Sequence, residues 1–354
     1  MVVNRRGLTL LTAAVVIFSA ALGAQAPNTP KRDDKKQSDA QKKETLEVVK
    51  LADSVAAGQP AANDFGLTWA HEDYLKATGN KQYVPFTLTF DQSKLPSGQV
   101  ALYWRVVAKD AAAAAPAPAA SGKKDDKDKD KGKAPKYAYE DINFITPANG
   151  RLSRAFTVGA GSYDVYVIMK EAAGTQKNAP PAKASVIKQT LNVPDFWSAE
   201  LTTSSVIVAQ KIEPLAAPLS PVEQLERPYA LGMMEVVPAL DSKFSTKGEL
   251  SIFMLIYNPK TDAMNKPDVT VEYNFYQKPA GAAEKFFNKT SPQELNGKTL
   301  PAAFDMSLGH QLQTGQAVPL MSFPAGDYRL EIKVTDKLGT KTVTRDVNFT
   351  VTAG

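Results

Sequence analysis

Residues 160–167 read Ala-Gly-Ser-Tyr-Asp-Val-Tyr-Val, and residues 325–332 read Ala-Gly-Asp-Tyr-Arg-Leu-Glu-Ile. In both stretches a glycine turn precedes a tyrosine that opens a run of alternating residues. This pattern is typical of the tyrosine corner of Greek-key sandwiches, in which the ring is buried and the hydroxyl bonds to upstream backbone. Tyr163 and Tyr328 are therefore predicted to be structural, and the chain is predicted to contain two related β-sandwich domains.

The rest of the chain fits an all-β fold with two immunoglobulin-like domains in tandem. Its 354 residues leave room for two or three domains. Short alternating segments bounded by Gly, Pro or Asn place the first sandwich at residues 63–194 and the second at residues 195–354. The alternation is strongest at residues 328–335, where apolar residues share one face and polar residues share the other.

Two charged, low-complexity tracts interrupt this pattern. Residues 27–62 are predicted to form a flexible leader, with a short amphipathic helix at residues 42–57. Residues 109–136 run from Ala and Pro into alternating Lys and Asp, and are predicted to be a disordered loop insertion. The net charge of +5 therefore reflects solvated tracts, and nucleic-acid binding is not expected.

The N-terminal residues resemble an export signal. Arg5 and Arg6 precede an apolar run at residues 8–22 and then small residues, as in a secretory signal peptide covering residues 1–26. Cleavage after Ala26 or after Gly23 fits, and both the general secretory and the twin-arginine routes stay open. After the signal no apolar run is long enough to span a bilayer. The mature chain is predicted to be secreted or periplasmic, without a transmembrane span, and with no Cys it has no disulfide.

Three residues are candidates for a partner surface. If Tyr163 and its alternate neighbours face the first core, Tyr166 and Ile168 point outward as an apolar patch, where the second repeat carries charges. Contact with the insertion, the leading helix or the neighbouring domain explains this patch equally well. Tyr276 lies opposite the apolar residues of its own strand and is the third candidate.

The residues that catalysis and metal binding require do not occur in suitable patterns. The two histidines, His71 and His310, lie in different domains, which leaves little for a His-based triad or metal site. Asp126, Asp128 and Asp130 begin like a calcium loop, but Lys131 stands where the loop needs glycine. We therefore expect no enzyme activity, no metal and no cofactor.

A family resemblance follows from residues 201–208, 244–253 and 325–328. These segments resemble the C-terminal immunoglobulin-like modules of exported bacterial proteins, which often accompany GWxTD or von Willebrand A-type domains and whose function is unknown. The resemblance implies an extracytoplasmic module and brings no catalytic residues. The chain itself has no Gly-Trp-x-Thr-Asp string and no metal-ion adhesion motif.

These observations favour a non-enzymatic interaction or scaffolding protein of the cell envelope. The expected partner is another envelope protein or a cell-wall polysaccharide, recognised by edge strands or end loops. The first alternative is a carbohydrate-binding module, in which Trp69 and Trp197, with Tyr166, stack on sugars. The second alternative is a hydrolase whose carboxylates come together from different strands.

Overall fold

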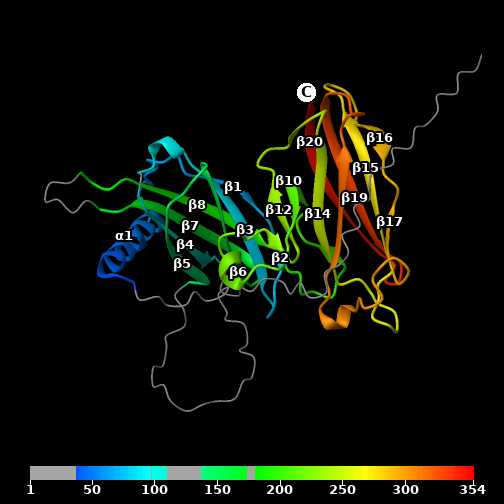
Figure 1. Ribbon diagram of the computed structural model, residues 1–354, viewed down its shortest axis with the longest axis horizontal. Coiled ribbons are helices and arrows are strands. Elements are labelled where there is room, and N and C mark those ends of the chain that lie inside the picture. The colour runs from blue at the N-terminus through cyan, green and yellow to red at the C-terminus, as the bar shows by residue number, and fades with distance from the viewer. Residues whose placement is uncertain (1–36, 97, 110–136, 174–179) are drawn as a thin grey trace, which may run out of the picture. The chain divides into compact units, whose positions relative to one another are not determined.

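The computed structural model describes residues 37–96, 98–109, 137–173 and 180–354. The predicted signal peptide, the start of the leader and nearly all of the 109–136 insertion lie outside this part of the chain. The described chain is mostly β and divides into two compact units (Figure 1). The first unit runs to Trp197 and also contains Leu219–Ala230, and the second contains Ser198–Pro218 and Leu231–Gly354.

The predicted all-β class is confirmed. The first unit contains α1 (Asp39–Ala56), β1 (Thr68–Glu72), β2 (Leu75–Lys76), β3 (Gln82–Thr89), η1 (Gln92–Lys94), β4 (Val100–Ala108), β5 (Tyr139–Ile145), β6 (Arg151–Val158), β7 (Gly161–Glu171), β8 (Ala184–Val193) and α2 (Pro221–Gln224). The second contains β9 (Thr202–Thr203), β10 (Ile207–Pro214), β12 (Met234–Pro238), β13 (Lys243–Ser245), β14 (Glu249–Tyr257), β15 (Val269–Lys278), β16 (Lys285–Lys289), β17 (Gln293–Leu295), η2 (Met306–Leu308), β18 (Leu312–Pro319), β19 (Gly326–Asp336) and β20 (Lys341–Thr352), while β11 (Ala230–Leu231) lies at the junction.

Two sheets enclose the core of the first unit. One sheet has the order β5-β4-β7-β8, and in the other β3 pairs with β1 and β2 along one side and with β6 along the other. Alternate residues of facing strands fill the space between them, as in Phe86 of β3, Trp104 of β4 and Val165 of β7. Period-two alternation along these strands places one face of each in the core.

The outer face of the β5-β4-β7-β8 sheet is covered by α1. A capping box of Ser38 and Gln41 starts this helix, which is why it begins before the predicted residue 42. Val48 and Ala52 of the helix pack on Tyr103 of β4 and on the outer residues of β7. The predicted amphipathic helix is thus confirmed as an integral layer of the first unit.

The other sheet of the first unit is covered by residues that come later in the sequence. Leu219–Ala230, here called the strap, lies against β3. The Tyr83 hydroxyl donates to the Pro228 carbonyl at 3.0 Å, and Tyr229 is almost fully buried. This differs from the predicted boundaries, which assigned the strap and residues 195–197 to the second domain.

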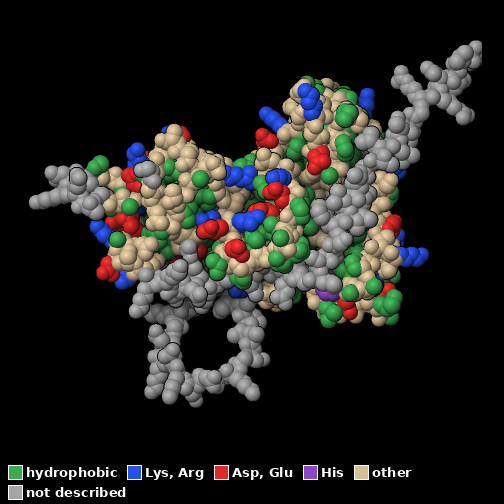
Figure 2. All heavy atoms as spheres, viewed as in Figure 1, with side chains coloured by type: hydrophobic (Ala, Val, Ile, Leu, Met, Phe, Trp, Pro, Cys, Tyr) green, Lys and Arg blue, Asp and Glu red, His purple; other side chains and the backbone are tan. Residues whose placement is uncertain are grey.

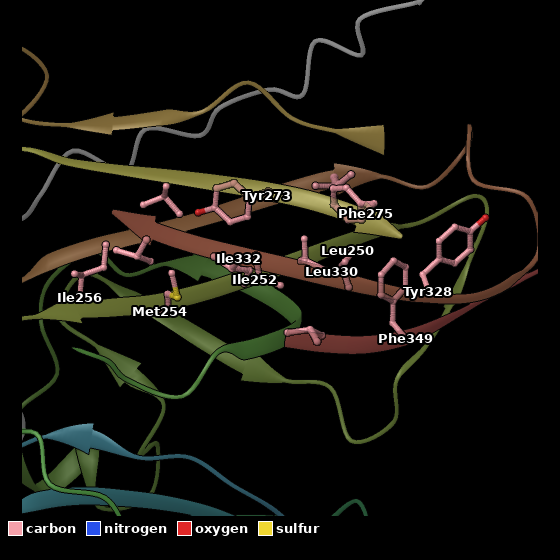
Figure 3. Packing of buried hydrophobic residues seen from close by; sticks show 14 of the residues in the cluster. Leu250, Ile252, Met254, Ile256, Tyr273, Phe275, Tyr328, Leu330, Ile332 and Phe349 are labelled. Atoms are coloured by element: carbon pink, nitrogen blue, oxygen red, sulfur yellow. The ribbon is translucent and has the colours of Figure 1, made fainter. Parts of the chain in front are cut away.

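The second unit is a sandwich of two larger sheets. Their orders are β11-β12-β10-β14-β18, with β9 beside β14, and β13-β20-β19-β15-β16, with β17 beside β15. Figure 3 shows Leu250 and Ile252 of β14 packed against Leu330 and Ile332 of β19. The outward residues of β19 are polar, so the predicted division of this strand into a packed and a wet face is confirmed.

Both predicted tyrosine corners are confirmed. The Tyr163 hydroxyl donates to the Gly159 carbonyl at 3.0 Å, and the Tyr328 hydroxyl donates to the Pro324 carbonyl at 2.7 Å. The shared glycines, Gly161 and Gly326, have φ angles of 144° and 151°, which side-chain-bearing residues rarely adopt. In both repeats the glycine therefore provides the positive φ angle that the chain adopts two residues before the buried tyrosine.

Candidate functional site

Tyr166 and Ile168 do not form a free surface. They are 5% and 0% exposed because α1 covers them, and they pack with Val48 and Ala52 of the helix. Of the explanations for this apolar patch, contact with the leading helix is the one that the structure shows. These two residues are thus part of the hydrophobic interior and not a partner site.

Two buried cations hold α1 in place over this patch. Lys170 of β7 contacts Glu44 at 2.6 Å and Glu47 at 2.9 Å, and Arg105 of β4 contacts Asp53. Burial by itself lowers the pKa of Lys170, but the bonds to the two glutamates outweigh it and raise the pKa. The lysine therefore stays charged beneath the helix.

The two tryptophans predicted to stack on sugars do not form an exposed pair. Trp69 is half-buried and stacks on Phe86 with ring centroids 4.5 Å apart, and its Nε1 donates to Glu72. Trp197 is 40% exposed, but the ammonium of Lys76 lies 4.3 Å from its ring centroid. With Tyr166 buried as well, these residues do not provide the flat aromatic platform that sugar stacking requires.

Tyr276 lies in an exposed cluster on the second unit. Its ring meets that of Phe286 edge to face at 5.9 Å, and the Arg329 guanidinium lies 4.4 Å from its centroid. Phe286 is 58% exposed and belongs to β16, at the edge of its sheet. We call Tyr276, Phe286 and Arg329 the aromatic cluster.

Acidic residues fix the arginine of the aromatic cluster. Arg329 bonds to Glu284 at 2.6 Å, to Glu331 at 3.3 Å and to Asp346. The bond to Glu284 is the main reason that the pKa of Arg329 is raised. The guanidinium is therefore held over the Tyr276 ring, and the cluster is ordered before any partner arrives.

A cleft opens on the first unit at the edge where β5 and β6 meet. It is shallow and widely open to solvent, has a volume of about 480 Å³, and is lined by residues 144–148 at the end of β5 and its turn, by residues 151–154 of β6, and by Glu226 of the strap. Apart from Glu226, the lining residues lie within the short segment 144–154, but that segment contains none of the sequence signals that we considered. Both Arg151 and Arg154 line this cleft.

A polar network lies under the strap and reaches the cleft. His71 Nε2 lies 2.8 Å from Asp73 Oδ2, and the Tyr229 hydroxyl, which donates to the Pro85 carbonyl at 3.4 Å, lies near the same carboxylate. The Tyr229 hydroxyl also lies near Thr87, whose hydroxyl is 2.8 Å from that of Ser153, a cleft residue. These five side chains, called the polar network, connect β1, β3, β6 and the strap.

Burial perturbs the ionisation of the polar network. It raises the pKa of Asp73, although interactions with His71 and Tyr229 oppose this. Burial lowers the pKa of His71, but the hydrogen bond and the charge of Asp73 outweigh it, so the net shift is upward. Burial thus disfavours the charged form of Asp73, while Asp73 favours the charged form of His71.

The remaining candidate residues are dispersed. His310 accepts the Asp305 N–H at 2.9 Å in the second unit, far along the chain from His71. Among the described residues no group of three or more His, Asp or Glu side chains could hold a metal ion. Asp126, Asp128 and Asp130 lie outside those residues. None of the helices in the described ranges is long and apolar enough to cross a membrane.

The surface of each unit carries mixed charge. Figure 2 shows basic and acidic side chains interspersed over the face in view, with apolar side chains between them. Ion pairs such as Lys333 with Glu272 and Lys188 with Asp164 account for part of this pattern. Such a surface is typical of a protein solvated on most sides, with recognition confined to local sites.

Comparisons with known proteins give only distant similarities. No model of a known protein family matches the chain, and no curated protein matches it. Among solved structures it is similar to Escherichia coli alpha-2-macroglobulin activated by porcine elastase, with 11% identity, 78% of this chain and 22% of that chain covered, and a TM-score of 0.23. It is also similar to dimeric latent PorU from Porphyromonas gingivalis, with 9% identity, 92% and 21% covered, and a TM-score of 0.27. The chain spans less than a quarter of the length of either structure.

Proposed function

We propose that this chain is a non-enzymatic, extracytoplasmic interaction protein of the cell envelope, which binds a partner protein through the aromatic cluster of its second unit. The observation that carries the proposal is the exposure of Phe286, 58% free on an edge strand and packed against Tyr276 and Arg329. Tyrosine, phenylalanine and arginine are enriched in protein interfaces, and tyrosine and arginine are common hot spots. The export signal predicted at residues 1–26 supports the location.

The geometry of β16 favours an extended partner segment. Within the described ranges the strand pairs with β15 alone and ends its sheet, so its other side carries backbone groups to which a strand could be added. Along β16 side chains alternate: Phe287 packs against the core, and Phe286 points outward. An added strand would gain ladder hydrogen bonds and bury an apolar side chain against Phe286.

Lysines at both ends of this strand restrict what can pair with it. Lys285 and Lys289 flank the two phenylalanines, and charged edge residues discourage self-association. The preferred partner strand therefore carries acidic residues opposite these lysines and an apolar residue between them. Specificity thus comes from charge matching, and affinity comes from Phe286 and the backbone.

Site-specific photocrosslinking in native envelopes tests this proposal. A benzoylphenylalanine placed at Phe286 is expected to form one discrete adduct with an envelope protein, and Tyr276→Ala is expected to reduce its yield several-fold. The same probe at Met264, which is 67% exposed elsewhere on the second unit, is the matched control and should not form that adduct.

The polysaccharide alternative is decided by sedimentation with purified cell-wall polysaccharide. Co-sedimentation that is lost in Trp197→Ala, without an adduct at Phe286, would favour a carbohydrate-binding module. An adduct at Phe286 that equally forms at Met264 would show non-specific contact, and the proposed surface would be abandoned.

A further inference from the structure

The edge strand β18 of the second unit carries a row of outward-facing backbone groups. Within the described ranges β18 pairs with β14 alone and ends its sheet. Just beyond the strand the Leu320 N–H donates to the Gly248 carbonyl at 3.0 Å, and this bond fixes the phase of the antiparallel ladder. Gln313, Gly315 and Ala317 therefore direct their N–H and C=O groups away from β14. In the described part of the chain nothing bonds to these outward groups.

β18 also lacks the charges that protect other sheet edges. Its residues, Leu312–Pro319, include no ionisable side chain. Among the described strands every other edge strand longer than two residues carries at least one, such as Glu140 in β5, Lys188 in β8 and Lys285 in β16. Charges of this kind keep two copies of an edge from pairing, because like charges would lie face to face. A second copy of β18 meets no such repulsion.

Antiparallel pairing of two β18 strands about a two-fold axis at Gly315 gives every outward group a partner. In this register Gly315 lies opposite Gly315 of the second copy, and Gln313 lies opposite Ala317 of the second copy. Residues opposite each other in a hydrogen-bonded antiparallel pair exchange both N–H···O bonds. The side chains at these positions are uncharged and the axis residue has none, so the two strands can approach to the ordinary spacing.

A buried amide supplies a second, independent observation. Gln316 is only 6% exposed, and its Nε2 is buried without a hydrogen-bond partner among the described residues, which is unfavourable. In the register above, Gln316 lies opposite Thr314 of the second copy, in a pair whose side chains come close together. Thr314 Oγ1 lies 2.7 Å from the Tyr273 hydroxyl and donates to Gln293, so it keeps a lone pair that can accept from this amide.

We propose that this protein forms a weak homodimer in which β18 pairs antiparallel with β18 of a second copy, with the two-fold axis at Gly315. The proposal rests on the uncharged edge, whose outward groups have no described partner, and on the unsatisfied Gln316 amide. One strand pair buries less surface than a permanent interface needs, so we expect a dissociation constant of about 10–100 μM. β18 and the aromatic cluster belong to different sheets of the second unit, so the dimer is independent of the proposed function.

Sedimentation equilibrium of the mature protein tests the proposal. Between about 1 and 300 μM the wild type is expected to pass from monomer to dimer. Gln313→Lys combined with Ala317→Lys places lysines opposite each other on both sides of the axis and should weaken the dimer at least about tenfold. Gln313→Glu combined with Ala317→Glu should weaken it for the same reason.

Mixing the two charged double variants gives the sharper result. Each lysine then faces a glutamate, so the mixed dimer is expected to regain at least the wild-type affinity. Since this recovery needs both chains folded, a loss caused by unfolding is distinguished from a loss at the interface. Met264→Lys combined with Leu308→Lys adds the same charge at exposed positions of the second unit outside β18, and should leave the dimer unchanged.

Engineered disulfides test the register, because the chain contains no cysteine of its own. Opposite residues of a hydrogen-bonded antiparallel pair have Cα atoms about 5.5 Å apart, which a disulfide can span. Gln313→Cys mixed with Ala317→Cys should therefore give a cross-linked dimer on mild oxidation. Either variant alone should not, because each cysteine then lies about 14 Å from its counterpart.

Four results would overturn the proposal. They are a monomer at every concentration up to about 300 μM, a dimer whose affinity is the same in the charged double variants, a mixture of those variants that stays monomeric, and cross-linking that is as efficient in either cysteine variant alone as in the mixture. A failure of the aromatic cluster to capture a partner leaves these measurements unaffected.

Discussion

At the scale of single residues, His71 and Asp73 form a pair in the first unit whose pKa values are both raised. Asp73 lies beneath the strap, where an ionised carboxylate is unfavourable, and the charge on His71 offsets part of that penalty. His71 lies at the end of β1 and Asp73 directly after it, so the two side chains lie on the same face. A histidine followed two residues later by an aspartate could therefore have been recognised as a pair in the sequence. Its significance depends on burial by the strap, which local sequence does not reveal.

The pH dependence of stability follows from the direction of these shifts. The pKa of His71 is raised on folding, so its stabilising contribution is fully present below the ordinary value near 6.5 and is lost as the pH rises through the folded value. The raised pKa of Asp73 acts in the same direction at lower pH. The first unit is therefore expected to lose stability as the pH rises above about 6.5.

Urea unfolding followed by tryptophan fluorescence checks this expectation. All three tryptophans, at positions 69, 104 and 197, belong to the first unit, so the signal reports that unit alone. His71→Gln is expected to lower stability at pH 6 and to flatten the loss towards pH 9. His310→Gln, in the second unit, should leave the pH dependence of the free energy of unfolding as in the wild type. If His71→Gln also kept the wild-type pH dependence, His71 would not be its source.

At the scale of elements, α1 depends on its buried ion pairs as well as on its apolar face. Lys170→Met leaves the Glu44 carboxylate buried without its cation, and we expect it to destabilise the first unit by about 3 kcal/mol. Adding Glu44→Gln should recover part of this loss, because the stranded charge is then removed. Tryptophan-monitored unfolding in urea measures both changes.

An exposed ion pair on the same helix provides the control. Lys42 and Asp39 lie 2.8 Å apart with side chains 61% and 99% exposed, and such pairs contribute little. Lys42→Met should therefore leave the unfolding curve nearly unchanged. A loss as large as that of Lys170→Met would mean that helix propensity and not the buried pair holds α1.

The elements differ in how far their own sequences predict them. Strands such as β7 and β19 were predicted because alternation, a glycine turn and a tyrosine all lie within one short segment. Short strands such as β13 and β16 were not predicted, since neither shows a clear alternation of its own; β13 pairs with the distant β20, and β16 pairs with the preceding β15. Tyr276 was a candidate because of the pattern of its own strand. Its neighbours Phe286 and Arg329 lie on other strands, and only the pairing of β16 and β19 with β15 brings them next to Tyr276.

At the scale of the whole molecule, sequence order and structural membership differ at the strap. Tyr229 lies in the second half of the chain but is buried in the first unit. We expect Tyr229→Ala to destabilise the first unit by about 3 kcal/mol or more, as for other large aromatic truncations. The lower urea midpoint should appear in the tryptophan signal.

Tyr273→Ala supplies the comparison for that experiment. Tyr273 is as deeply buried as Tyr229, but it lies in the core of the second unit, which contains no tryptophan. Its replacement should leave the tryptophan transition in place while lowering the stability seen by circular dichroism. If Tyr229→Ala behaved in the same way, the strap would not be part of the first unit.

The strap also sets an order of events during biosynthesis. The first sandwich can pair all its strands once residue 193 has been made. Tyr83, Pro85 and Thr87 of β3, however, are covered by the strap only after residue 230 has been made as well. A chain that emerges from its N-terminus thus holds an unfinished sandwich while a further stretch is synthesised or translocated. The last folding step of the first unit, docking of the strap, therefore waits until the strap has been synthesised. A fragment that ends at Trp197 lacks the strap and cannot complete this step.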